Sequence, residues 1–356
     1  MTRQRQTLWR KIIFKDENPQ SPVKQSYFRH IFNREFNLGF GNPKTDVCST
    51  CIELNEVHKL RSKAFFKMMQ EKEDDMITFS FDCQKNSPLP RIPDQSAYYS
   101  RQFYLHNFTI ISSAVYDRLN KTNLAGITVI RLFADGCGGQ NKNSIMLGML
   151  SKWLLEHATV KKIEIIFPVT GHSFMPPDRV FGNIEKVIKK REVIIQPEKY
   201  CNVISSHATV TNLRDIEVFD FKSATQKVFK PTAKWPFKIT QCKRFIIKRS
   251  KTPGNTLIRG EMFYQSDLNK SSNVCKTGQK TSMLRPSTIS LGAPVTRAKI
   301  ADVDKLLQKH FGLDWKERDD LKFYLDIIRG PTSEENQNLE ESWCEGISEE
   351  SPDLRV

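Results

Sequence analysis

The spacing of apolar residues changes several times along the chain, and each change predicts a different element. Apolar side chains at 27, 28, 31, 32 and 36 have helical spacing and predict an N-terminal helical arm, and the charged segment 52–75 also suits a helix. From residue 76 the pattern is that of a mixed α/β core over 76–215. The expected strands are 76–82, 98–104, 108–115, 126–134 and 162–169, and the expected helices are 141–157 and 178–190.

Beyond residue 215 the helical period is lost, and short strands are expected at 218–221, 243–248 and 256–264. These strands predict a β-rich basic region over 216–295, in which 265–295 has the composition of a loop. Helical spacing returns over 298–328, which predicts a helical region at 296–330. The sequence therefore divides into 1–75 (arm and helical region), 76–215 (core), 216–295, 296–330 and a disordered acidic tail, 331–356.

The composition narrows the class of protein. Apolar residues make up 38% of 356, which is enough for a packed core. The chain has no run of 18 apolar residues, so no membrane-spanning helix is expected. The first ten residues carry charge without the apolar stretch of a secretory signal, so we expect an intracellular chain whose cysteines stay reduced.

The charge is unevenly distributed. The chain has a net charge of +15, but residues 331–356 hold eight acids and one base, a net −7, which leaves +22 for residues 1–330. A body this basic favours a polyanionic partner, usually nucleic acid. A basic protein without such a partner is the alternative.

Three aspartates lie at the ends of expected elements. Asp82 ends the first strand, Asp135 ends strand 126–134, and Asp178 opens the helix after strand 162–169. A carboxylate just past the C-terminal edge of a strand points into the crevice where α/β sheets bind ligands. Three such carboxylates could hold two Mg²⁺ or Mn²⁺ ions for phosphodiester chemistry. The alternative roles are turn residues for the first two and an N-cap for the third.

Further side chains near these acids are candidates for a catalytic or a nucleic-acid-binding role. Glu185 competes with Asp178 as the third acid because it lies two turns further along the same helix face. His172 would orient a carboxylate or the scissile phosphate, unless it is an ordinary loop histidine. Candidate nucleic-acid contacts, for some of which helix capping is the alternative, are Gln140, Asn141, Lys142, Asn143, Arg179, Lys186 and Lys189.

Cys48 and Cys51 have the spacing of half a zinc site. No second CxxC follows, so a Zn²⁺ site there would need a distant pair of ligands. A turn carrying two thiols is the alternative.

Four strings in a fixed order resemble a poorly characterised family of animal proteins related to cut-and-paste DNA transposases. They are 42–51, 81–85, 133–143 and 171–182. The resemblance spans about 26–330 and implies an RNase H-like fold with an acidic triad for metal-dependent DNA strand cleavage or transfer. Such a protein would bind DNA in the nucleus, with self-association left open. The alternative is a domesticated, catalytically silent protein that binds DNA or chromatin.

Overall fold

A mixed five-stranded sheet organises the described part of the chain. This computed structural model describes residues 55–333 except 85, 106–110, 172–173, 213–214, 265, 267–268, 290–293 and 331. The sheet order is β1-β4-β5-β6-β7. The first three strands are parallel, and the last two continue the sheet in antiparallel fashion. The strand bounds are β1 Met76–Phe81, β4 Val129–Ala134, β5 Lys162–Ile166, β6 Arg244–Arg249 and β7 Thr256–Glu261.

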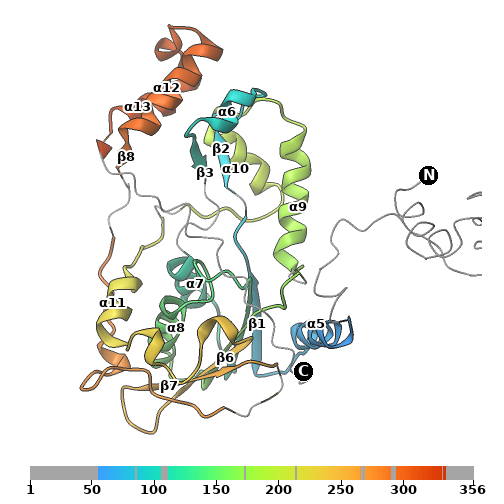
Figure 1. Ribbon diagram of the computed structural model, residues 1–356, viewed down its shortest axis with the longest axis vertical. Helices are drawn as coiled ribbons and strands as arrows, with labels where there is room; N and C mark the ends of the chain where they lie inside the picture. Colours follow the sequence, from blue (N-terminus) through green and yellow to red (C-terminus); the bar gives the residue numbers. More distant parts are fainter. Residues whose placement is uncertain are drawn as a thin grey trace, which may run out of the picture. The chain divides into compact units, whose positions relative to one another are not determined.

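One face of the sheet is covered by three helices, α7 (Ile111–Asn120), α8 (Ser144–Glu156) and α11 (Phe221–Val228) (Figure 1). Alternate residues of β4 point to this face, because successive side chains of a strand lie on opposite sides. Ile130 and Leu132 therefore join Trp153 of α8 in a core of fully buried side chains.

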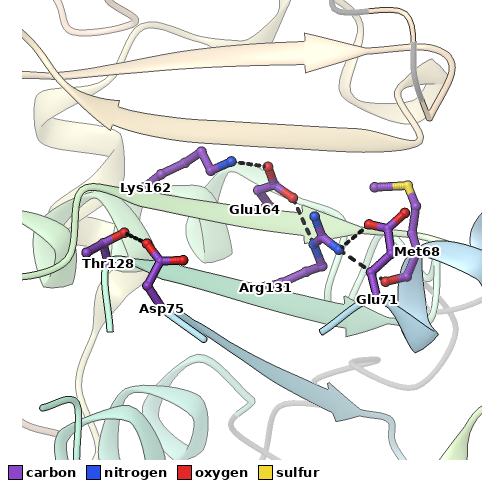
Figure 2. Close-up of polar contacts among 7 residues, drawn as sticks. All are labelled: Met68, Glu71, Asp75, Thr128, Arg131, Lys162 and Glu164. Atoms are coloured by element: carbon purple, nitrogen blue, oxygen red, sulfur yellow. Dashed lines mark hydrogen bonds and ion pairs between the residues drawn. The ribbon is translucent and has the colours of Figure 1, made fainter. Parts of the chain in front are cut away.

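The other face is covered by α5 (Asn55–Gln70), whose Phe65 packs edge-on against Phe133 of β4. Beside this contact lies a buried ionic network (Figure 2). Arg131 donates to Glu164 on β5 at 3.0 Å, and it also donates to Glu71 and to the Met68 carbonyl at the end of α5. Lys162 pairs with the other oxygen of Glu164 at 2.7 Å. These bonds join α5 to two central strands.

A second core is built from α9 (Pro176–Lys189), α10 (Pro197–Ser205), α12 (Arg297–Phe311), α13 (Lys322–Ile328) and the ribbon of β2 (Ser87–Leu89) with β3 (Phe103–Leu105). Tyr324 is fully buried there and donates to the Ile195 carbonyl at 2.7 Å. The short elements are α6 Gln95–Tyr99, β8 Val295–Thr296, β9 Thr332–Ser333, and the 3-10 turns η2 Thr232–Lys234, η3 Ile239–Gln241, η4 Thr281–Met283, η5 Trp315–Glu317 and η6 Asp319–Leu321.

The α/β class and most of the long elements are confirmed, but three expected strands are wrong. Of the expected strand 108–115, the described residues 111–115 lie in α7, where Val115 and Leu119 are buried one helical turn apart. Segment 98–104 contains the end of α6 and the start of β3. Segment 218–221 makes a single bridge at Phe219 before α11 begins.

Two strands of the region expected to be separate, 216–295, complete the central sheet as β6 and β7. The helical arm expected at 26–40 and nearly all of the tail, 331–356, lie outside the described residues. Among the described helices, none is long and apolar enough to cross a membrane.

Candidate functional site

The carboxyl ends of β1 and β4 bring two of the predicted acids to the same edge of the sheet. The last residues of these parallel strands, Phe81 and Ala134, are register partners, and Asp82 and Asp135 follow them directly. Neighbouring strands lie about 4.8 Å apart, so the two acids leave the sheet side by side. Both side chains are half-buried.

Asp178 reaches this edge from α9, which packs against β1. The helix begins with Pro176 and Pro177, residues that suit a first turn because they need no backbone donor. Asp178 Oδ2 accepts a hydrogen bond from the Met175 N–H at 2.6 Å. Asp178 is therefore not the N-cap itself, a position that Met175 holds. It lies at N3, where its carboxylate accepts from the N-cap backbone, and this bond occupies one of its two oxygens.

Asp82 is affected electrostatically by the two other acids. Burial, together with the charges of Asp135 and Asp178, raises the pKa of Asp82 to about 6. The Cys83 N–H donates to Asp82 Oδ1 at 2.7 Å and partly opposes this rise. Burial, followed by the charge of Asp82, likewise raises the pKa of the Cys83 thiol to about 12. At neutral pH this edge of the sheet therefore holds carboxylates under mutual repulsion beside a protonated thiol.

Carboxylate oxygens in this situation suit a hard divalent cation, because positive charge would offset both the burial and the repulsion by Asp135 and Asp178 that raise the pKa of Asp82. However, no three His, Cys, Asp or Glu side chains within the described ranges are grouped closely enough to hold a metal ion. The acids that the strand register brings next to each other here are Asp82 and Asp135, and the charge of Asp178 acts on Asp82.

The loop between β4 and α8 is held together by its own backbone. The Cys137 carbonyl accepts from the N–H groups of Gln140, Asn141 and Lys142 at 2.9–3.2 Å. Asn143 is the N-cap of α8, because its Oδ1 accepts from the Met146 N–H and its amide nitrogen donates to two loop carbonyls. The helix-capping role considered for Asn143 is therefore confirmed, and its contact with nucleic acid stays a prediction.

Asn141 and Lys142 are buried, which their polarity did not indicate. Asn141 is 1% exposed, and neither polar atom of its side chain has a hydrogen-bond partner among the described residues. The Lys142 ammonium donates to the Thr240 carbonyl at 2.6 Å and lies 5.6 Å from the centre of the Phe167 ring. Burial, with the nearby charge of Lys243, lowers the pKa of Lys142 to about 8. Lys142 therefore links the loop carrying Asp135 to η3.

The exposed face of α9 carries the bases predicted to contact nucleic acid. Lys186 is exposed, and the guanidinium of Arg179 lies 5.7 Å from the centre of the Phe174 ring. Lys189 and Glu185 form an exposed ion pair at 3.5 Å. Glu185 is thus occupied by a partner on its own helix, whereas Asp178 interacts with Asp82.

The remaining candidate ligands and catalytic groups, His172, Cys48 and Cys51, lie outside the described residues. What the sequence did not indicate is the environment of Lys142. A lysine next to a polar stretch has no pattern that distinguishes a buried position from an exposed one.

One domain family matches part of the chain. Residues 95–257 match the Domain of unknown function (DUF7869), a span of less than half the chain. It contains Asp135 and Asp178 but not Asp82. Comparison with curated proteins and with solved structures finds no match. The matched segment runs from α6 into β7, so similarity to one family extends across the strands on both sides of residue 215.

Proposed function

We propose that this chain is a transposase-related, metal-dependent enzyme that cleaves or transfers DNA strands through an RNase H-like core. The observation that carries the proposal is the register of β1 and β4, which places Asp82 and Asp135 side by side at the carboxyl edge of the sheet. Paired carboxylates at that edge are a recurrent setting for divalent ions in phosphodiester chemistry.

The order of elements also favours an RNase H-like core. The implied order of strand with acid, strand with acid, helix, strand, and helix with acid corresponds to β1, β4, α8, β5 and α9. The two strands expected between β1 and β4 are replaced by the short β2 and β3 together with α6 and α7. The arrangement of the strands differs from the implied layout in two further respects. β2 and β3 form a ribbon of their own, while β6 and β7 extend the sheet beyond β5.

In this mechanism Asp82 and Asp135 would bind Mg²⁺ or Mn²⁺, with Asp178 adding negative charge beside them. The bound ion would supply Lewis acidity at the scissile phosphate and a nucleophilic water or hydroxyl at neutral pH. The exposed bases Lys186 and Arg179 on α9 would hold the DNA backbone next to the acids. Lys142 would keep the loop carrying Asp135 in place through its bond to η3.

A catalytically silent DNA-binding protein is the second candidate, and the capping bond of Asp178 favours it. A carboxylate that serves a helix start has a structural reason to be present without any metal.

A nicking experiment on supercoiled plasmid with Mn²⁺ or Mg²⁺ distinguishes the two. We expect nicking by the wild-type chain, its loss with EDTA, and its loss in Asp135→Asn with the fold retained by circular dichroism. The matched control is Asp326→Asn, an exposed aspartate on α13. Cleavage without metal, or by Asp135→Asn at the wild-type rate, would contradict the proposal. Plasmid binding without nicking would favour the silent protein.

A further inference from the structure

Most of the excess positive charge lies in one part of the chain, which does not contain Asp82, Asp135 or Asp178. Residues 221–260 contain eleven lysines and arginines and no acid, and residues 268–290 contain four bases and no acid. A folded surface with so little compensating charge repels itself, which favours a bound polyanion.

Backbone bonds bring five of these bases together into what we call the lysine cluster. The segment after α11 pairs with residues 274–276: the Lys230 N–H donates to the Val274 carbonyl, and the Lys276 N–H donates to the Val228 carbonyl, both at 2.9 Å. The Ser282 N–H donates to the Gly254 carbonyl in the turn between β6 and β7. These bonds join the end of α11, the segment 276–280 and the β6–β7 turn. The cluster consists of Lys227, Lys230, Lys251, Lys276 and Lys280.

The side chains of the cluster are available to a partner. Four of them are exposed and Lys230 is half-buried. Lys276 donates to the Gln226 carbonyl, which leaves its charge uncompensated. Within the described ranges, none of the five forms an ion pair. The acid on β7, Glu261, is 1% exposed and paired with Arg259.

The lysine cluster lies at the opposite end of the sheet from the acids. β6 runs antiparallel to β5, and Lys248 pairs with Lys162 at the start of β5, so the β6–β7 turn lies near the amino ends of the parallel strands. Asp82 and Asp135 follow the carboxyl ends. A strand of six residues spans about 20 Å, so the two surfaces are separate.

The chemistry of the surface indicates the kind of partner. Among the described residues of 221–290, no Phe, Tyr or Trp is exposed. Single-stranded nucleic acid is usually bound by stacking its bases on exposed aromatic rings, whereas lysines contact phosphates without reading sequence. We propose that the lysine cluster binds the phosphate backbone of duplex DNA, independently of metal and of the acidic site.

The test compares two triple variants by titration of a fluorescent 20-base-pair DNA duplex in EDTA, at several salt concentrations. The first, Lys251→Gln/Lys276→Gln/Lys280→Gln, removes three charges of the cluster. The control, Lys199→Gln/Lys305→Gln/Lys322→Gln, removes three exposed charges on α10, α12 and α13. With about 0.9 counterions released per neutralised phosphate, the cluster variant should reduce the slope of log K against log[salt] by about 2.7 and weaken low-salt binding more than about tenfold. The control should bind like the wild type.

Because the titration contains no metal, it does not depend on whether the chain cleaves DNA. Equal affinities of the cluster variant and the wild type would overturn the proposal, as would equal weakening by the control. Tighter binding of single-stranded DNA than of the duplex would also overturn it. A cluster variant that loses binding to phosphatidylserine vesicles but still binds the duplex like the wild type would overturn it as well. Thermal unfolding of both variants should match the wild type, and if the cluster variant is destabilised, single substitutions at the same positions give the same comparison.

Discussion

Replacing Asp82 by Asn should stabilise the folded chain at neutral pH. Burial raises the pKa of Asp82 from 3.8 to about 6, and Asp135 and Asp178 contribute to the rise. At about 1.36 kcal/mol per pKa unit, the ionised carboxylate lowers the free energy of unfolding by about 3 kcal/mol before screening, and by about 2 kcal/mol once partial solvent access is considered. Asn keeps an oxygen that can accept from the Cys83 N–H, so little else is lost.

The pH dependence follows from the sign of the shift. The folded pKa lies above the unfolded value, so the folded state binds more protons between pH 3.8 and about 6, and stability falls as pH rises through this window. Urea unfolding in EDTA should show Asp82→Asn about 2 kcal/mol more stable than the wild type at pH 7.5 and nearly equal to it at pH 4. Added Mg²⁺ should then raise the unfolding midpoint of the wild type only.

The exposed aspartate variant Asp326→Asn is the control and should change stability by less than about 0.5 kcal/mol at either pH. A stability difference for Asp82→Asn that is the same at pH 4 and pH 7.5 would refute the electrostatic reasoning. Destabilisation at pH 7.5 would show that the carboxylate makes net favourable contacts. Equal stabilisation of wild type and variant by Mg²⁺ would exclude Asp82 as a ligand.

Two further predictions concern the buried network and the tail. Although burial raises the pKa of Glu164, Lys162, Arg131 and Arg244 outweigh it, and the net pKa is lowered. Glu164→Gln should therefore destabilise the chain by about 3 kcal/mol in urea unfolding at pH 7, and less below pH 4.5, where the wild type loses the same charge. A loss below about 1 kcal/mol at pH 7 would contradict this. Deleting 331–356, which carries −7, should tighten duplex binding at low salt and matter less at high salt, since a tethered polyanion competes for the same bases. Equal low-salt affinities would show that the tail does not mask the basic surface.

The elements that were predicted correctly from the sequence are those whose own residues show the apolar pattern of a strand or a helix. β4 is apolar except for Arg131, as expected of a strand covered on both faces, and α8 has apolar residues on successive turns. The helices over 111–120 and 221–228 were not predicted, because residues at or next to their start indicated strands instead. In α11, Phe221, Ala224, Thr225 and Val228 are buried at helical spacing, but the short aromatic stretch before them has the composition of a strand.

In the candidate site, too, some features follow from local sequence patterns and others from contacts between distant segments. That Asp82 and Asp135 each follow a strand can be read from the residues, because strand periodicity is a local property. That the two strands are parallel neighbours in register depends on contacts between segments about 50 residues apart, and these alone place the carboxylates together.

The burial of Lys142 and the capping role of Asn143 also depend on tertiary structure, because polar side chains have no periodicity that distinguishes a solvated position from a buried one with a partner. The identity and spacing of residues along the chain were enough to predict the α/β class, the acids at the strand ends and the excess of positive charge. The pairing of the strands, the enclosure of Lys142 and the gathering of five lysines at one end of the sheet were decided by long-range packing, because each requires partners that are distant along the chain.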